Sequence, residues 1–153
     1  MRLGLTLLVR LLLSVPAAAQ NREVPYWAAL RDEEVRMRVG PSENFPIDWI
    51  YRRQGLPVKV VRVMQGWRLV EDPDGTRGWI HERLLTTNPG AIVVGDGLAE
   101  LREAGKPGAR VLWRAEPGVV GALGDCASGW CELAVGSRKG WVRAERLWGA
   151  GEP

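Results

Sequence analysis

One stretch of this chain occurs twice. Residues 66–84 read GWRLVEDPDGTRGWIHERL, and residues 129–147 read GWCELAVGSRKGWVRAERL. Both begin with Gly-Trp and a short apolar segment, pass through a glycine-containing turn to basic-Gly-Trp-aliphatic, and end on Glu-Arg-Leu. The copies are 63 residues apart at Trp67 and Trp130, and 62 apart at Trp79 and Trp141. This period is too long for a solenoid unit, so two copies predict two small domains in tandem.

Within each copy, short apolar segments alternate with turns, a pattern typical of an all-β domain. Residues 58–60 and 61–63 alternate in opposite phases, which indicates a β-bulge or a strand buried on both faces. Residues 72–75, Asp-Pro-Asp-Gly, predict a tight turn between strands, and residues 136–137, Gly-Ser, predict its counterpart. Upstream, residues 51–55 match residues 113–117 more weakly. We therefore expect one domain over residues 26–87 and a second over residues 90–148, packed together because the linker is short.

The first 19 residues have the features of a secretory signal peptide. They combine a basic start, an apolar stretch interrupted by Arg10, and the sequence Ala17-Ala18-Ala19. The apolar stretch is too short for an anchor, because spanning a membrane takes about 20 apolar residues. We therefore expect cleavage after Ala19, export to the periplasm or the medium, and no stable membrane insertion after cleavage.

Charge argues against a nucleic-acid partner. The chain has 21 Lys and Arg and 18 Asp and Glu, and cleavage would remove Arg2 and Arg10, leaving 19 − 18 = +1. The remaining charges of both signs are interspersed, whereas a nucleic-acid-binding protein usually carries a stripe of positive charge.

The only two cysteines, Cys126 and Cys131, are separated by four residues that include Ser128-Gly129. In an oxidising compartment such a close pair most often forms a disulfide, here across the ends of a hairpin. Free structural thiols are the alternative. A zinc site needs about four ligands, and His81 is the only histidine, so we expect no metal and no other cofactor.

The spacing of Gly-Trp, Asp-Gly and Gly-Trp-Ile resembles the bacterial SH3 domain (SH3b), a small, strongly bent β-barrel. That family usually opens with Asn-hydrophobic-Arg-x-Gly-Pro-Ser, and residues 36–42 read Arg-Met-Arg-Val-Gly-Pro-Ser, which differs only at Arg36. The second copy keeps hydrophobic-x-x-hydrophobic-Arg at residues 98–102 but lacks Gly-Pro-Ser. The resemblance covers nearly all of the chain after residue 19 and extends to exported bacterial proteins with tandem SH3b domains. It implies an all-β chain of two tandem SH3-like small β-barrels after a signal peptide.

The same resemblance implies a binding module, since SH3b domains are associated with recognition of cell-wall peptides and sometimes of proteins. In SH3-like folds, aromatic residues near the Gly-Pro-Ser loop stack on extended or proline-rich peptides. The candidate groove residues here are Trp27, Trp49 and Tyr51, with Glu43 and Asp48 setting the local charge preference. Trp27, together with Tyr26, could equally pack on the barrel as an apolar strap, and the two acids could form a solvated rim.

Trp67, Trp79, Trp130 and Trp141 recur at matching positions, and we expect these four to fill the two small cores. The chain offers no catalytic set, because a pair such as Glu71 and Asp74 lies on a turn without the facing geometry a glycosidase needs. The sequence predicts a non-catalytic exported module that binds a peptide-like ligand, foremost the cell-wall (peptidoglycan) stem peptide. An envelope protein-protein adaptor or accessory subunit is the alternative, and a Cys-dependent peptidase using His81 is a third hypothesis.

Overall fold

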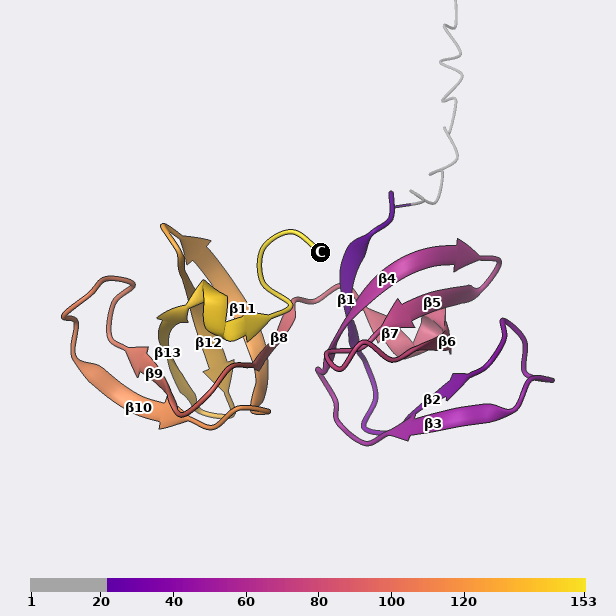
Figure 1. Ribbon diagram of the computed structural model, residues 1–153, viewed down its shortest axis with the longest axis horizontal. Helices are drawn as coiled ribbons and strands as arrows, with labels where there is room; N and C mark the ends of the chain where they lie inside the picture. The colour runs from indigo at the N-terminus through magenta and orange to yellow at the C-terminus, as the bar shows by residue number, and fades with distance from the viewer. Residues whose placement is uncertain (1–21) are drawn as a thin grey trace, which may run out of the picture.

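The computed structural model describes residues 22–153, so the predicted signal peptide lies outside the described residues. The first half of this region forms seven strands and one 3-10 turn (Figure 1). These are β1 (Tyr26–Leu30), β2 (Val35–Arg38), β3 (Ile47–Tyr51), β4 (Pro57–Met64), β5 (Trp67–Glu71), β6 (Arg77–His81), η1 (Glu82–Leu84) and β7 (Leu85–Thr86).

The second half repeats this succession of elements. It contains β8 (Gly90–Val93), β9 (Ala99–Arg102), β10 (Val111–Ala115), β11 (Val120–Ala127), β12 (Trp130–Val135), β13 (Arg138–Arg143), η2 (Ala144–Arg146) and β14 (Leu147–Trp148).

Each half is a single antiparallel sheet, with the orders β3-β2-β6-β5-β4-β1-β7 and β10-β9-β13-β12-β11-β8-β14. The predicted all-β tandem architecture is therefore confirmed. The outermost strands of the first sheet are β3 and β7, and those of the second are β10 and β14. Among the described residues, neither pair of outermost strands is joined by hydrogen bonds. Each sheet thus folds over on itself around a core without closing into a hydrogen-bonded ring.

The first core lies between β2 and β3 on one side and β4 and β5 on the other (Figure 1). Its residues come from all six long strands because alternate positions on each strand face inward. The fully or almost fully buried members include Leu30, Val35, Met37, Val58, Val60, Val70 and Ile80. Three of the four repeated tryptophans, Trp67, Trp79 and Trp130, are buried as expected, and Trp141 is half-buried.

A glycine precedes the second tryptophan of each repeat because another strand passes directly over it. A Cβ atom at Gly78 would lie 2.4 Å from Cγ of Met37, and one at Gly140 would lie 2.9 Å from Cβ of Leu101. Neither position accommodates a side chain without displacing the core. The basic-Gly-Trp signature thus records a close approach between β6 and β2, and between β13 and β9.

Strand pairing corrects two details of the alignment between the copies. Trp49 pairs with Met37 and Trp113 pairs with Leu101, so Trp113 corresponds to Trp49 and not to Tyr51. Tyr51 corresponds to Ala115, which pairs with Ala99 as Tyr51 pairs with Val35. The predicted match of residues 51–55 with residues 113–117 was therefore wrong by two positions.

The Glu-Arg-Leu match is also wrong, by one residue. The turn η1 spans Glu82–Leu84 and η2 spans Ala144–Arg146, so the offset of 62 found at Trp79 and Trp141 continues to the end of the repeat. The carbonyls at the end of both turns accept equivalent hydrogen bonds, from the backbone N–H of Arg31 in one copy and Val94 in the other.

Local predictions from the turns and cysteines are confirmed. The β4–β5 ladder shifts register between Val60 and Arg62, which is the predicted β-bulge. Residues 72–76 form the predicted β5–β6 turn, and residues 136–137 form the two-residue β12–β13 turn. Cys126 and Cys131 are paired across β11 and β12 and form a disulfide, with Ser128 and Gly129 both at positive φ in the hairpin turn.

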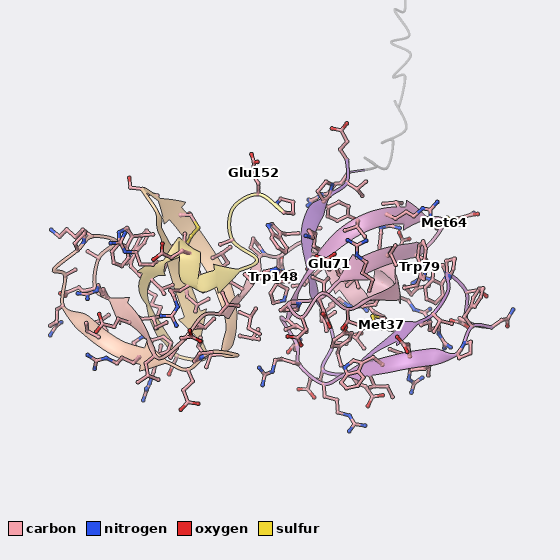
Figure 2. The ribbon with its side chains drawn as sticks, viewed as in Figure 1. Met37, Met64, Glu71, Trp79, Trp148 and Glu152 are labelled. Atoms are coloured by element: carbon pink, nitrogen blue, oxygen red, sulfur yellow. A yellow bond between two sulfur atoms is a disulfide. The ribbon has the colours of Figure 1, made fainter. Side chains whose placement is uncertain are left out.

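The two domains pack against each other, as the short linker predicts. Ile92 and Val120 from the second domain pack on the core of the first, and the Arg53 guanidinium donates to the carbonyl of Gly118. The C-terminal segment also turns back toward β1 (Figure 1). Figure 2 shows Trp148 at this junction, where its ring meets Trp27 edge-on at 4.6 Å between centroids.

Candidate functional site

An arginine at the end of the second strand shapes the long hairpin loop of each domain. Nη1 of Arg38 donates to the carbonyl of Phe45 at 2.7 Å, and Nη1 of Arg102 donates to the carbonyl of Ala109 at 2.6 Å. A backbone hydrogen bond also closes each loop. In the first domain the N–H of Val39 donates to the carbonyl of Pro46, and in the second the N–H of Glu103 donates to the carbonyl of Arg110. The second copy therefore keeps this loop although it lacks Gly-Pro-Ser, because the arginine that closes it is retained.

In the first domain, this loop forms one wall of a cavity of about 250 Å³. The other walls come from Glu34 and the outward-facing residues of β2, from the start of β5, and from the end of β6 with η1. The lining residues are Glu34, Arg36, Arg38, Glu43, Trp67, His81, Arg83 and Leu84.

The second domain has a cavity of about 400 Å³ in the same place. Each of the eight residues that line the first cavity has a structural counterpart in the lining of the second. The sequence distance between counterparts is 64 residues for those in or next to β2 and its following loop, 63 for Trp67, and 62 for those at the end of β6 and in η1. These counterparts are Leu98, Glu100, Arg102, Pro107, Trp130, Arg143, Glu145 and Arg146. We call the two cavities the twin pockets.

A largely buried tryptophan forms the floor of each twin pocket. Trp67 is 8% exposed, and its ring meets the His81 imidazole edge-on at 5.2 Å between centroids. Nδ1 of His81 accepts the backbone N–H of Arg83. In the second domain, the Arg143 guanidinium takes the place of His81 and lies over the Trp130 ring, 4.6 Å from its centroid. Both floors offer an aromatic surface next to a nitrogen-bearing side chain.

The rim of the first pocket carries charges of both signs that are weakly paired. Arg36 and Glu34 are 3.5 Å apart, Arg83 and Glu43 are 3.4 Å apart, and all four side chains are exposed. Exposed ion pairs of this kind contribute about 0–1 kcal/mol, so a ligand can displace them at little cost.

The lining of the second pocket also has three arginines and two glutamates, but two of these arginines form hydrogen bonds or ion pairs within the protein. Arg102 pairs with Glu100, and Arg146 donates to the carbonyls of Val94 and Gly97 at 2.7 and 2.8 Å. The first pocket therefore has the more available guanidinium groups.

The five groove residues named from the sequence lie in three places. Glu43 is on the rim of the first twin pocket. Trp49, which is 59% exposed, and Tyr51, which is 7% exposed, line a different cavity beside the β5–β6 turn, and Asp48 is exposed on the same strand. Trp27 lies at the domain junction, where its indole N–H donates to the carbonyl of Gly151 at 2.9 Å.

Tyr51 belongs to the first core and contributes only a small exposed part of its side chain to this cavity. Its hydroxyl donates to Oδ2 of Asp72 at 2.9 Å. Burial, the hydrogen bond to Asp72, and the negative charges of Asp72, Asp74 and Asp48 all raise the pKa of Tyr51 far above its ordinary value. The hydroxyl therefore stays protonated and acts as a fixed donor.

This raised pKa predicts a loss of stability at alkaline pH. Below the unfolded-state pKa of about 10, Tyr51 is protonated in both states and its contribution is complete. Above that pH the unfolded chain releases the proton and the folded chain keeps it, so the free energy of unfolding falls by about 1.4 kcal/mol per pH unit from this group. We expect urea titrations between pH 9 and about 11.5 to show this extra slope in the wild type and not in Tyr51→Phe. Equal slopes for the two proteins would contradict the assignment.

Sequence reasoning did not assign Trp67, Arg36 or Arg83 to a site. The repeated Gly-Trp was the available signal, but it was attributed to the core. Comparison of the two copies does not single out the rim residues, because Arg36 and Arg83 correspond to Glu100 and Glu145, which have the opposite charge.

Among residues 22–153, no three His, Cys, Asp or Glu side chains come close enough together to hold a metal ion. No helix in this part of the chain has the length and apolar character required to cross a membrane.

Comparison with known proteins gives a family and distant structural similarities. The model of the bacterial SH3 domain matches residues 31–86 and again residues 95–149. NlpC1 from Trichomonas vaginalis is 12% identical with a TM-score of 0.36, and the alignment covers 85% of this chain and 48% of that one. For NlpC2 of the same organism these values are 12%, 0.37, 83% and 49%.

An NlpC/P60 family protein from Bacillus cereus is 15% identical with a TM-score of 0.35, over 80% of this chain and 56% of that one. The chain thus spans about half the length of these solved proteins. No curated protein matches its sequence. The two family matches cover most of the described residues, one in each sheet, and the chain belongs to the bacterial SH3 domain family.

Proposed function

We propose that this protein is a non-catalytic module whose twin pockets bind a peptide-like ligand, foremost the stem peptide of the cell wall. The observation that carries the proposal is the presence of a pocket at the same place in both domains, lined from corresponding positions. Two of the eight lining residues are the same in both pockets, namely the tryptophan of the floor (Trp67 and Trp130) and the arginine that closes the loop (Arg38 and Arg102). Membership in a family of peptide- and wall-binding domains supports the same class of ligand.

The chemistry of the pockets favours a short charged peptide. A guanidinium group matches a carboxylate in geometry and charge, and Arg36 and Arg83 are exposed on the rim of the first pocket. The Trp67 floor offers an apolar surface for the aliphatic part of the same ligand, and Glu34 and Glu43 can pair with an ammonium group. Cell-wall stem peptides carry free carboxylates and amines on short aliphatic residues, which fits these walls.

The disulfide supports an exported protein. Disulfides form and persist in oxidising compartments, and Cys126 and Cys131 are joined in the second domain. We therefore propose that the protein acts in the periplasm or outside the cell, where it meets cell-wall peptides. The family supports the absence of catalysis, since SH3b domains generally act as binding modules.

Sedimentation with purified peptidoglycan tests the proposal. We expect the protein to pellet with the wall at low salt, and Arg36→Ala/Arg83→Ala to reduce the bound fraction at least about five-fold, because it removes the most available carboxylate partners. The matched control, Arg62→Ala/Arg138→Ala, removes two exposed arginines outside the pockets and leaves the net charge equal to that of the test variant. Binding should then stay within about two-fold of wild type if the pocket, and not net charge, is responsible.

A protein that remains in the supernatant would contradict the wall ligand. In that case a pulldown from envelope extract distinguishes the alternative, since a specific protein band lost in Arg36→Ala/Arg83→Ala would assign the same pockets to an adaptor function. Equal loss of wall binding in the test and control variants would show that charge alone, and not the twin pockets, holds the protein to the wall.

A further inference from the structure

Exposed large apolar side chains gather at one edge of the first domain. Nine such residues are exposed in the described chain, and five of them lie on β3 or on the loop before it. These five are Val39, Phe45, Ile47, Trp49 and Ile50. β3 is a terminal strand that pairs only with β2 in the described structure, so its other edge keeps unpaired backbone groups. An exposed apolar edge strand of this kind is a typical docking place for an extended chain.

A cavity of about 480 Å³ opens between β3 and the β5–β6 turn. The exposed indole of Trp49 forms one wall, and residues 72–76 form the opposite wall. We call this cavity together with the edge of β3 the Trp49 groove. It shares no lining residue with the twin pockets.

Two exposed carboxylates at and near the groove have no ion-pair partner among the described residues. Asp48 and Asp74 are both exposed, and neither forms an ion pair with any residue that the structure describes. Two arginines also border the cavity. Arg53 donates to the carbonyl of Gly118, and Arg52 forms an exposed ion pair with Glu34 at 3.6 Å. Asp74 lines the cavity together with Trp49, and Asp48 precedes Trp49 on β3 outside that lining. Free carboxylates near an exposed indole match a cation, which such a ring attracts through its face.

The second domain serves as an internal comparison because it has the same fold without these features. Leu112 and Ala115 stand in place of Asp48 and Tyr51, and a two-residue turn replaces the five-residue turn that holds Asp74. Trp113 corresponds to Trp49 but is half-buried, and its indole N–H donates to the carbonyl of Lys139 at 3.1 Å. The architecture of the domain therefore does not require an exposed tryptophan with unpaired carboxylates nearby.

We propose that the Trp49 groove binds an extended segment of a partner polypeptide that carries a Lys or Arg side chain between apolar residues. The segment pairs with the free edge of β3, its cationic side chain lies over the Trp49 ring between Asp48 and Asp74, and its apolar side chains cover Ile47 and Ile50. This site lies beyond the proposed twin-pocket function and prefers the opposite charge.

The test uses three blocked tripeptides of the form acetyl-Val-X-Val-amide, with X being lysine, norleucine or glutamate. Each is titrated into the isotopically labelled protein while backbone and indole N–H signals are followed by NMR. We expect the lysine peptide to shift the Trp49 indole signal and the amides of residues 47–51 and 72–76, with an affinity about ten-fold above that of norleucine. The glutamate peptide should bind more weakly than norleucine.

Variants separate the groove from unspecific charge attraction. Trp49→Ala and Asp48→Asn/Asp74→Asn should each weaken the lysine peptide at least about five-fold, because they remove the cation–π partner or the two carboxylates. Asp125→Asn removes an exposed carboxylate from the second domain and should leave the affinity unchanged. Arg36→Ala/Arg83→Ala should also leave it unchanged, so that a failure of the twin pockets and a failure of the groove are distinguishable. Equal affinities for the three peptides, or no shift at Trp49 with the lysine peptide, would overturn the proposal.

Discussion

Asp72→Ala is expected to destabilise the first domain by about 3 kcal/mol, because it leaves one buried donor and two partly buried donors without an acceptor. The Asp72 carboxylate is 7% exposed, and Oδ2 accepts the Tyr51 hydroxyl. Oδ1 accepts the backbone N–H groups of Asp74 and Thr76 at 3.0 and 2.9 Å. One side chain thus holds the β5–β6 turn and the end of β3 together. Urea unfolding measured by far-UV circular dichroism gives the free-energy change.

The neighbouring acid provides the matched control. Asp74→Ala removes an exposed carboxylate with no side-chain partner in the described residues, and should change the free energy of unfolding by less than about 0.5 kcal/mol. Asp72→Asn keeps one acceptor oxygen and should fall between the two. A change below about 1 kcal/mol for Asp72→Ala would mean that the turn does not depend on this carboxylate.

Gly149→Ala is expected to release the C-terminal segment from the first domain. A Cβ atom there would lie 2.4 Å from the carbonyl oxygen of Gly90 and 2.9 Å from Cβ of Pro57, and the residue has a φ of 107°. Both the contact with fixed backbone and the left-handed conformation oppose a side chain, so we expect a loss of about 2–4 kcal/mol. The measurement is hydrogen exchange of the Trp27 indole N–H, which should accelerate at least about ten-fold as its bond to Gly151 is lost.

Gly151→Ala separates the steric effect from the conformational one. Gly151 also has a positive φ, 73°, but nothing lies within 4 Å of the position of its Cβ atom. This variant should cost only about 1 kcal/mol, the usual cost of a left-handed alanine. Similar effects of the two variants would mean that contact with Gly90 and Pro57 does not hold the tail in place.

Some features of this protein are decided by short segments of sequence, and others depend on tertiary contacts. The Asp-Pro-Asp-Gly turn and the cysteine pair could be predicted because each is decided within six residues of chain. The repeated basic-Gly-Trp is visible in the sequence, but its cause is tertiary, because a Cβ atom at Gly78 would meet Met37 of another strand. By contrast, Tyr51 lies in the core and also lines the cavity beside Trp49, and its bond to Asp72 has no local signal, because only the bend of the sheet places β3 beside Asp72, 21 residues further along the chain.

The candidate sites show the same division. Glu43, Trp49 and Asp48 were selected from the sequence, but it could not show that Glu43 belongs to one pocket and Trp49 to another. The rim of the first twin pocket joins Glu34, Trp67 and Arg83, which are far apart in sequence. Their charges differ between the two copies, so the internal repeat did not single them out.

The sequence by itself determined a tandem, all-β protein with its turns, its bulge and its disulfide, because strand periodicity and turn chemistry act over a few neighbouring residues. Only the tertiary structure decided where the twin pockets and the Trp49 groove lie, which tryptophans are exposed, and how the C-terminal segment joins the two domains. The physical reason is that a folded sheet brings together side chains from strands that are distant in the chain. Their contacts depend on register and bend, which no local pattern encodes.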